Sequence, residues 1–158
     1  MGGAHHRHRP GPHRAGGAGI AGTVGSPERF EFILDGPPVS QQTRRRERLH
    51  AWKLFVRGEA TKRWPQGQLP FLGPVGVSIT YFYELAGVDV DNIIKPILDA
   101  LVGLVYVDDE QVTDLQSRKR ILGGVRVGQV SDVLAEGFGR GRDFLHVLVV
   151  PAPDQEID

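Results

Sequence analysis

The sequence contains no cysteine, no long apolar run and no net charge. Without cysteine, disulfides and thiolate metal sites are excluded, so a bound metal would need oxygen or histidine ligands. No apolar run approaches the roughly 20 residues of a membrane-spanning helix, and the N-terminal residues lack the apolar stretch of a signal peptide. We therefore expect a soluble, cytoplasmic protein with no membrane partner.

The 158 residues predict one globular domain with a tail at each end. Residues 1–27 hold eight of the 21 glycines and four of the six histidines, with almost nothing to bury, and are expected to be disordered. The folded domain is predicted to span residues 28–153, and residues 154–158 are expected to fray.

Alternation of apolar and polar residues predicts strands, and apolar residues at helical spacing predict helices. Strands are predicted at 30–34, 75–83, 112–122 and 144–150, with a brief apolar run at 105–107. Helices are predicted within 40–64, from Asn92 to a stop at Gly103, and as a short segment that starts at Ser131 or Asp132. This order predicts an α+β fold, with a small mixed, largely antiparallel sheet packed by two main helices.

The neutral total conceals two segregated regions of charge. Residues 43–63 contain eight basic and two acidic side chains, whereas residues 84–114 contain eight acidic side chains and only Lys95 as a base. Such a domain can hold a polyanion on the first region and a divalent cation on the second. Two solvated surfaces of opposite sign are the alternative.

The acidic region has the residue types of a metal site. Asp89 and Asp91 are two apart after a strand, so their side chains emerge on one side of an extended chain. An antiparallel return of the chain through 105–107 would bring Asp109 beside them. Three carboxylates without sulfur favour Mg²⁺, with Mn²⁺ as an alternative ion, and such an ion suits phosphodiester hydrolysis.

A polar stripe on the predicted helix begins beside this aspartate pair. Lys95 lies one turn after Asp91, and Asp99 lies four residues after Lys95, where it can orient the ammonium. Pro96 would cost about 3 kcal/mol in a helix interior. If Asn92 caps the helix, Pro96 falls at the end of the first turn and at most one hydrogen bond is lost.

The motifs DVDNIIK, DAL and VYVDDEQV resemble those of the RusA family of Holliday junction resolvases. The resemblance implies small homodimeric endonucleases of bacteria or phages that act on branched DNA. It implies that Asp89, Asp91 and Asp109 bind the metal and are catalytic, together with Lys95. Asn92, Asp99 and Asp108 are expected to support the site. Residues 121–143 form a longer segment than a minimal member of the family has.

Basic residues of the first region are candidates for contacts to DNA phosphates, which give affinity with little sequence preference. Trp52 lies among apolar residues and is expected in the core. The candidate DNA-binding residues are Arg44, Arg45, Arg46, Arg48, Lys53, Arg57, Lys62 and Arg63.

The function predicted from these features is a Mg²⁺-dependent, structure-selective endonuclease that resolves four-way DNA junctions by symmetric hydrolysis in recombination and repair. Flaps or forks are alternative substrates for the same site. A non-catalytic branched-DNA-binding or regulatory module with a structural metal site is an alternative from another class.

Overall fold

The computed structural model describes residues 2–3, 25–85, 87–126 and 128–153. The predicted tails therefore lie largely outside the described residues. None of the helices within these ranges combines the length and the apolar character needed to cross a membrane. The elements are β1 (Phe30–Asp35), α1 (Arg46–Arg63), β2 (Val75–Tyr83), α2 (Ile94–Leu101), the 3₁₀ turn η1 (Asp109–Gln111), β3 (Val112–Ile121), the 3₁₀ turn η2 (Leu122–Gly124), α3 (Asp132–Gly139) and β4 (Phe144–Pro151).

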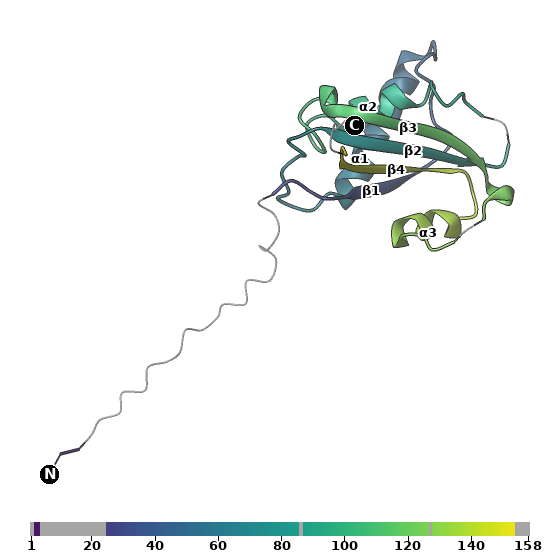
Figure 1. Cartoon of the computed structure of the whole chain (residues 1–158). Coiled ribbons are helices and arrows are strands. Elements are labelled where there is room, and N and C mark those ends of the chain that lie inside the picture. The colour runs from purple at the N-terminus through teal and green to yellow at the C-terminus, as the bar shows by residue number, and fades with distance from the viewer. Residues whose placement is uncertain (1, 4–24, 86, 127, 154–158) are drawn as a thin grey trace, which may run out of the picture.

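The four strands form one mixed sheet in the order β1, β4, β2, β3. β4 runs antiparallel to both β1 and β2, whereas β2 and β3 are parallel. A parallel pair needs a crossover connection, and α2 lies in it. The predicted α+β fold is confirmed, and Figure 1 shows α1 and α2 together behind the strands.

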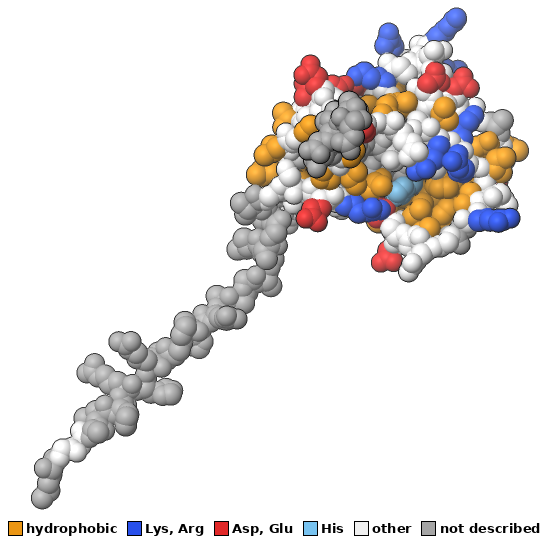
Figure 2. All heavy atoms as spheres, viewed as in Figure 1, with side chains coloured by type: hydrophobic (Ala, Val, Ile, Leu, Met, Phe, Trp, Pro, Cys, Tyr) orange, Lys and Arg blue, Asp and Glu red, His pale blue; other side chains and the backbone are white. Residues whose placement is uncertain are grey.

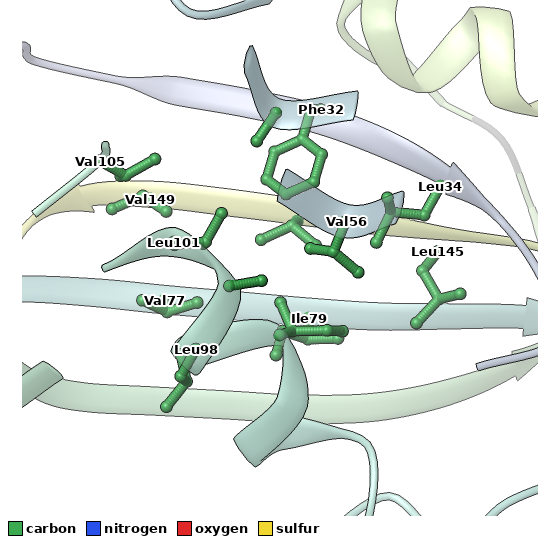
Figure 3. Packing of buried hydrophobic residues seen from close by; sticks show 14 of the residues in the cluster. Phe32, Leu34, Val56, Val77, Ile79, Leu98, Leu101, Val105, Leu145 and Val149 are labelled. Atoms are coloured by element: carbon green, nitrogen blue, oxygen red, sulfur yellow. The ribbon is translucent and has the colours of Figure 1, made fainter. Parts of the chain in front are cut away.

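One face of the sheet forms the main core. Val77 of β2 aligns with Val149 of β4, and Ile79 aligns with Val147, so alternate residues of neighbouring strands point to the same side. α1 contributes Leu49, Trp52, Val56 and Ala60 at helical spacing, all buried. Figure 3 shows these layers meeting, with Val56 of α1 and Leu101 of α2 facing the strand residues. The placement of Trp52 in the core is confirmed.

The other face of the sheet carries a second, smaller apolar cluster. Ile33, Phe82 and Phe144 point to this side and pack against Leu134 and Phe138 of α3. α3 starts as predicted at Asp132, because the Ser131 hydroxyl accepts a hydrogen bond from the Leu134 N–H and caps the helix. α3 therefore covers part of the face that α1 and α2 leave open.

Two local predictions were wrong. The chain does not return as an antiparallel strand at 105–107: Tyr106 forms only isolated bridges, and the next strand, β3, is parallel to β2. Val105 and Tyr106 are instead fully buried, which explains why this run is apolar. The Tyr106 hydroxyl donates to the Leu98 carbonyl of α2 at 2.7 Å. An apolar run of three residues does not distinguish a strand from a buried turn.

The start of α2 also differs from the prediction. The helix begins at Ile94 with Ile93 as its N-cap, so Asn92 is not the cap. Pro96 is the third helical residue, where an N–H has no partner within the helix, so it costs no helical hydrogen bond. Pro96 is also buried and does not belong to the polar stripe. The predicted stop is confirmed: Gly103 follows the helix with φ of 81°, a left-handed conformation that glycine adopts freely.

The packing of α3 on the sheet predicts that Gly137 cannot carry a side chain. A Cβ there would lie 2.3 Å from Cε2 of Phe144, whereas a Cβ at Gly139 would have no atom within 4 Å. Gly137→Ala should lower the free energy of unfolding by about 1–3 kcal/mol. The control Gly139→Ala should leave it unchanged or raise it by up to about 1 kcal/mol. Urea denaturation measures both, and equal stability of the two variants would contradict the packing of α3 described above.

Candidate metal and DNA-binding site

The segment between β2 and α2 is fixed at both ends. At its start, the Glu84 N–H donates to the Asp143 carboxylate at 3.0 Å. At its end, the Ser117 hydroxyl of β3 donates to the Val90 carbonyl at 2.7 Å. Between them the chain passes so close to Tyr81 that a Cβ at Gly87 would lie 2.9 Å from its ring. These contacts place Asp89 and Asp91 beside the outer edge of β3.

Asp89 and Asp91 are both exposed. Within the described part of the chain, neither carboxylate takes part in a hydrogen bond or an ion pair. The backbone between them is ordered by a turn, because the Asn92 N–H donates to the Asp89 carbonyl at 3.1 Å. Two exposed carboxylates without a counter-charge are available as oxygen ligands for a hard cation.

The turn η1 separates the roles of the neighbouring aspartates Asp108 and Asp109. The Asp108 carboxylate accepts from the Glu110 N–H at 3.1 Å and caps the turn, while the Gln111 side-chain oxygen accepts from the N–H groups of Val107 and Asp108. This reciprocal capping occupies Asp108. Asp109 is the member of the pair whose carboxylate does not cap η1, and Lys95 contacts it.

Gln111 is a positioning residue that sequence reasoning missed. Its amide nitrogen donates to the carbonyls of Phe71 at 2.7 Å and Gly73 at 3.0 Å, so the side chain ties η1 to the loop before β2. The signal was present in the sequence, because an aspartate followed three residues later by a glutamine is a capping pattern.

An alternating row of charges connects α1, α2 and η1. The Lys53 ammonium lies 3.2 Å from Oδ2 of Asp99, and Oδ1 of Asp99 lies 2.8 Å from the Lys95 ammonium. Lys95 in turn lies 2.9 Å from Oδ2 of Asp109. The predicted pairing of Lys95 with Asp99 is confirmed. The hydrogen bonds to Asp109 and then Asp99 raise the pKa of Lys95, and the bond from Lys95 is the main cause that lowers the pKa of Asp109.

The carboxylates fit a divalent cation by their chemistry but are not gathered around one point. Across residues 25–85, 87–126 and 128–153, no three acidic or histidine side chains lie close enough together to hold an ion. The predicted convergence of Asp109 on Asp89 and Asp91 is therefore not seen, because β3 is parallel to β2 and Asp109 pairs with Lys95 instead. Asp89, Asp91 and Asp109 stay the candidate ligands by the chemistry of their side chains.

Four arginines lie exposed on the same side of this segment. Arg44, Arg45, Arg46 and Arg48 enter and begin α1, where they line a concave surface with Glu47. The loop that precedes them is bonded to the aspartate segment, since the Gln41 N–H donates to the Asn92 carbonyl at 2.9 Å. A groove lined by Arg48 and Val88 runs between the two. The structure thus brings the start of α1, with four of the candidate DNA-binding residues, close to the segment that carries Asp89 and Asp91, and Arg48 shares a groove with Val88 of that segment.

The other four candidate DNA-binding residues have protein partners. Lys53 is paired with Asp99, and the Arg57 guanidinium donates to the carbonyls of Ala100 and Val102 at the end of α2. Lys62 lies 2.8 Å from Glu59, and Arg63 lies 2.7 Å from Glu136 of α3. Sequence spacing placed these side chains outside the core correctly. Lys53, Arg57 and Arg63 are long enough to reach neighbouring elements, whereas Lys62 pairs within α1 and stays exposed.

Comparison with known protein families places the site in a class. A family model described as "Endodeoxyribonuclease RusA" matches residues 35–128, which is more than half of the chain. The matched family is one of endodeoxyribonucleases. The chain belongs to the RusA family, whose members act on Holliday junctions. The matched range includes Asp89, Asp91, Lys95 and Asp109. No curated protein matches the chain.

The row of charges predicts a measurable change in the titration of Asp109. In Lys95→Met the pKa of Asp109 should rise toward its usual value of 3.8, because the main interaction that favours the carboxylate is removed. Carboxyl ¹³C chemical shifts followed against pH measure it. Lys62→Met, which removes a lysine paired elsewhere on α1, should leave Asp109 unchanged. An unaltered pKa in Lys95→Met would assign the shift to the capping turn instead.

Proposed function

We propose that this protein resolves four-way DNA junctions by divalent-metal-dependent hydrolysis of phosphodiesters, with Mg²⁺ as the ion and Mn²⁺ as an alternative. One observation carries the proposal. The loop that leads into four exposed arginines at the start of α1 is hydrogen-bonded to the segment that carries Asp89 and Asp91, so basic side chains lie near two carboxylates that have no partner among the described residues. Membership of the RusA family supplies the substrate class.

Each residue has a distinct role in this proposal. Asp89, Asp91 and Asp109 would hold the ion, which supplies positive charge that offsets the charge developing on the phosphate oxygens. A water oxygen forms the new bond to phosphorus, the bond to the leaving strand oxygen breaks, and that oxygen takes up a proton. Lys95, whose side chain is 53% exposed, would donate to a phosphate oxygen or the leaving oxygen as a compact cation. Asp99 holds Lys95 in position.

The N-terminus of α1 supports binding of a polyanion. Arg45 is the N-cap and makes no side-chain capping hydrogen bond, and Arg46 opens the first turn. Cations at this end oppose the helix dipole, and the first N–H groups of a helix lack partners within it. A DNA phosphate at this position would relieve both, so the arrangement is more stable with its ligand than without it.

A two-fold homodimer completes the proposal, because a four-way junction is itself two-fold symmetric and needs two matched nicks. β3 is an edge strand of ten residues, with Leu115 47% and Ile121 55% exposed. An exposed edge with apolar side chains is suited to contact with a second chain. In this arrangement each protomer would contribute one set of carboxylates.

A non-catalytic branched-DNA-binding module remains the second candidate. It is favoured by the contact between Lys95 and Asp109, which neutralises one of the three carboxylates without a metal ion. Incubation with a four-way junction and Mg²⁺ separates the two functions, since only the nuclease yields paired nicks that a chelator prevents.

Loss of one proposed metal ligand should separate binding from cleavage. Asp91→Asn should reduce junction cleavage at least about hundredfold, because a direct ligand matters more than the outer partners whose loss costs 10–100-fold. Junction binding should persist or tighten, since a negative charge near the DNA is removed. Gel assays with an immobile four-way junction measure both. Asp132→Asn, at the exposed start of α3, is the matched control and should cleave normally. Full cleavage by Asp91→Asn would refute the ligand assignment.

The arginines should differ in effect from the paired basic residues. Arg44→Gln combined with Arg46→Gln should weaken junction binding and lower the slope of log affinity against log salt by about 2, since each phosphate contact contributes about 0.9. Lys62→Gln combined with Arg63→Gln removes the same charge from residues that already have carboxylate partners, and should change the slope less. An equal change in the salt slope for the two double variants would show that the contact surface for DNA extends along all of α1.

A further inference from the structure

A pocket of about 440 Å³ lies on the face of the sheet opposite α1 and α2. Its floor comes from alternate residues of three neighbouring strands: His146 of β4, Thr80 and Phe82 of β2, and Arg118 and Arg120 of β3. The segment after β3 and one side of α3 form its walls. The volume lies within the range of small-molecule sites. Val130, Leu134, Phe138 and His146 lie beyond the range that the family model matches, whereas the three arginines of the pocket lie within it.

The polar part of the pocket is cationic. Arg118, Arg120 and Arg126 line it, and within the described part of the chain no aspartate or glutamate does so. The Arg118 Nε donates to the Thr80 hydroxyl at 2.8 Å, which orients its guanidinium on the sheet and leaves the two terminal nitrogens for a ligand. Three guanidiniums without an opposing acid favour an anion such as phosphate.

The carboxylate that contacts His146 of the pocket has other partners as well. Glu31 accepts from His146 Nε2 at 2.7 Å and from the Ser131 hydroxyl at 2.8 Å, and Arg29 lies 3.6 Å away. Burial is the largest cause that lowers the pKa of His146, so its ring adds no positive charge to the pocket near neutral pH. The cationic character therefore comes from the three arginines, and Glu31 does not cancel it.

The rest of the pocket is apolar. Phe82, Val125, Val130, Leu134 and Phe138 face it, and Phe138 and Phe82 belong to the small apolar cluster under α3. Figure 2 shows basic side chains beside an apolar patch on this face. Aromatic and aliphatic walls beside arginines suit a flat ring joined to a phosphate, since the ring packs on the apolar part and the phosphate meets the guanidiniums.

We propose that this pocket binds a nucleoside phosphate, either as a free mononucleotide or as an unpaired nucleotide of a single strand. Both sources offer the same chemistry, a base or sugar for the apolar walls and a phosphate for Arg118, Arg120 and Arg126. The pocket is separate from the segment that carries Asp89 and Asp91, which lies against β3 on the side of α2. It would let the domain hold a nucleotide without placing it at the proposed cleavage site.

The test uses the full chain with 2′-deoxyadenosine 5′-monophosphate, deoxyadenosine and inorganic phosphate as separate probes. Amide chemical shifts are followed by NMR, and affinity by calorimetry. The monophosphate should saturate a site whose shifts centre on Gly124–Arg126 and Phe138, and should bind at least about tenfold more tightly than either fragment, because only it uses both parts of the pocket. A 5′-phosphorylated tetrathymidylate distinguishes the sources: tighter binding identifies an unpaired strand, and weaker binding identifies a free nucleotide.

Two charge-matched double variants control the result. Arg120→Gln with Arg126→Gln alters exposed side chains of the pocket and should weaken monophosphate binding at least about tenfold, with an unchanged unfolding curve. Lys62→Gln with Lys119→Gln removes the same charge from side chains that do not line the pocket and should leave that affinity unchanged. The proposal is overturned if the monophosphate binds no tighter than its fragments, if the shifts centre on Arg44–Arg48, or if both variants lose affinity equally.

Discussion

Ion pairs around Asp99 connect α1, α2 and the turn η1 next to the candidate metal ligands. Each oxygen of its carboxylate faces a different lysine, Lys53 from α1 and Lys95 from α2, and Lys95 continues to Asp109 at η1. The row links two helices and the turn before β3, so the position of Asp109 depends on residues far away in the sequence. Acidic residues outnumber basic ones in this region, and the row leaves Asp89 and Asp91 without partners among the residues that the structure describes. The remaining demand for positive charge is therefore concentrated on these two residues.

The arginines at the start of α1 form a local excess of positive charge, opposite to the excess of negative charge around Asp89 and Asp91. They lie at a helix N-terminus, where the helix dipole disfavours cations, and only Glu47 lies nearby as an acid in the first turn. The two imbalances lie side by side because Gln41 binds Asn92. A DNA backbone and a divalent cation satisfy the two regions together, whereas direct pairing of the arginines with Asp89 would satisfy them without a ligand. Because the arginines and Asp89 are near each other but are not paired among the described residues, the arrangement favours binding of DNA and a cation over a purely structural role for these side chains.

Within the described residues, the sequence pattern predicted the four strands and the two main helices, and the capping residues Ser131 and Asp132 predicted the short helix α3. The contacts that long side chains make with neighbouring elements could not be predicted. Lys53 and Arg57 lie on the polar side of α1 as expected, yet α2 packs close enough for both to cross to it. The pairing of Lys95 with Asp99 follows from helical spacing, but its contact with Asp109 depends on the parallel course of β3. That course could not be inferred, since burial rather than strand pairing explains the apolar residues Val105 and Tyr106.

β3 couples the two sides of the molecule through its register. Ser117 faces the side of α2 and binds the Val90 carbonyl, whereas Arg118 faces the side of α3 and enters the pocket. Successive residues of a strand point to opposite faces, so a slip of one residue would exchange these roles and expose the buried partners. β3 pairs with β2 along one edge only, so this pairing, which aligns Ile79 with Ser117 and Thr80 with Arg118, controls both sites. The position of the segment that carries Asp89 and Asp91 and the position of the arginine pocket therefore both depend on one strand alignment, although the two lie on different faces of the sheet.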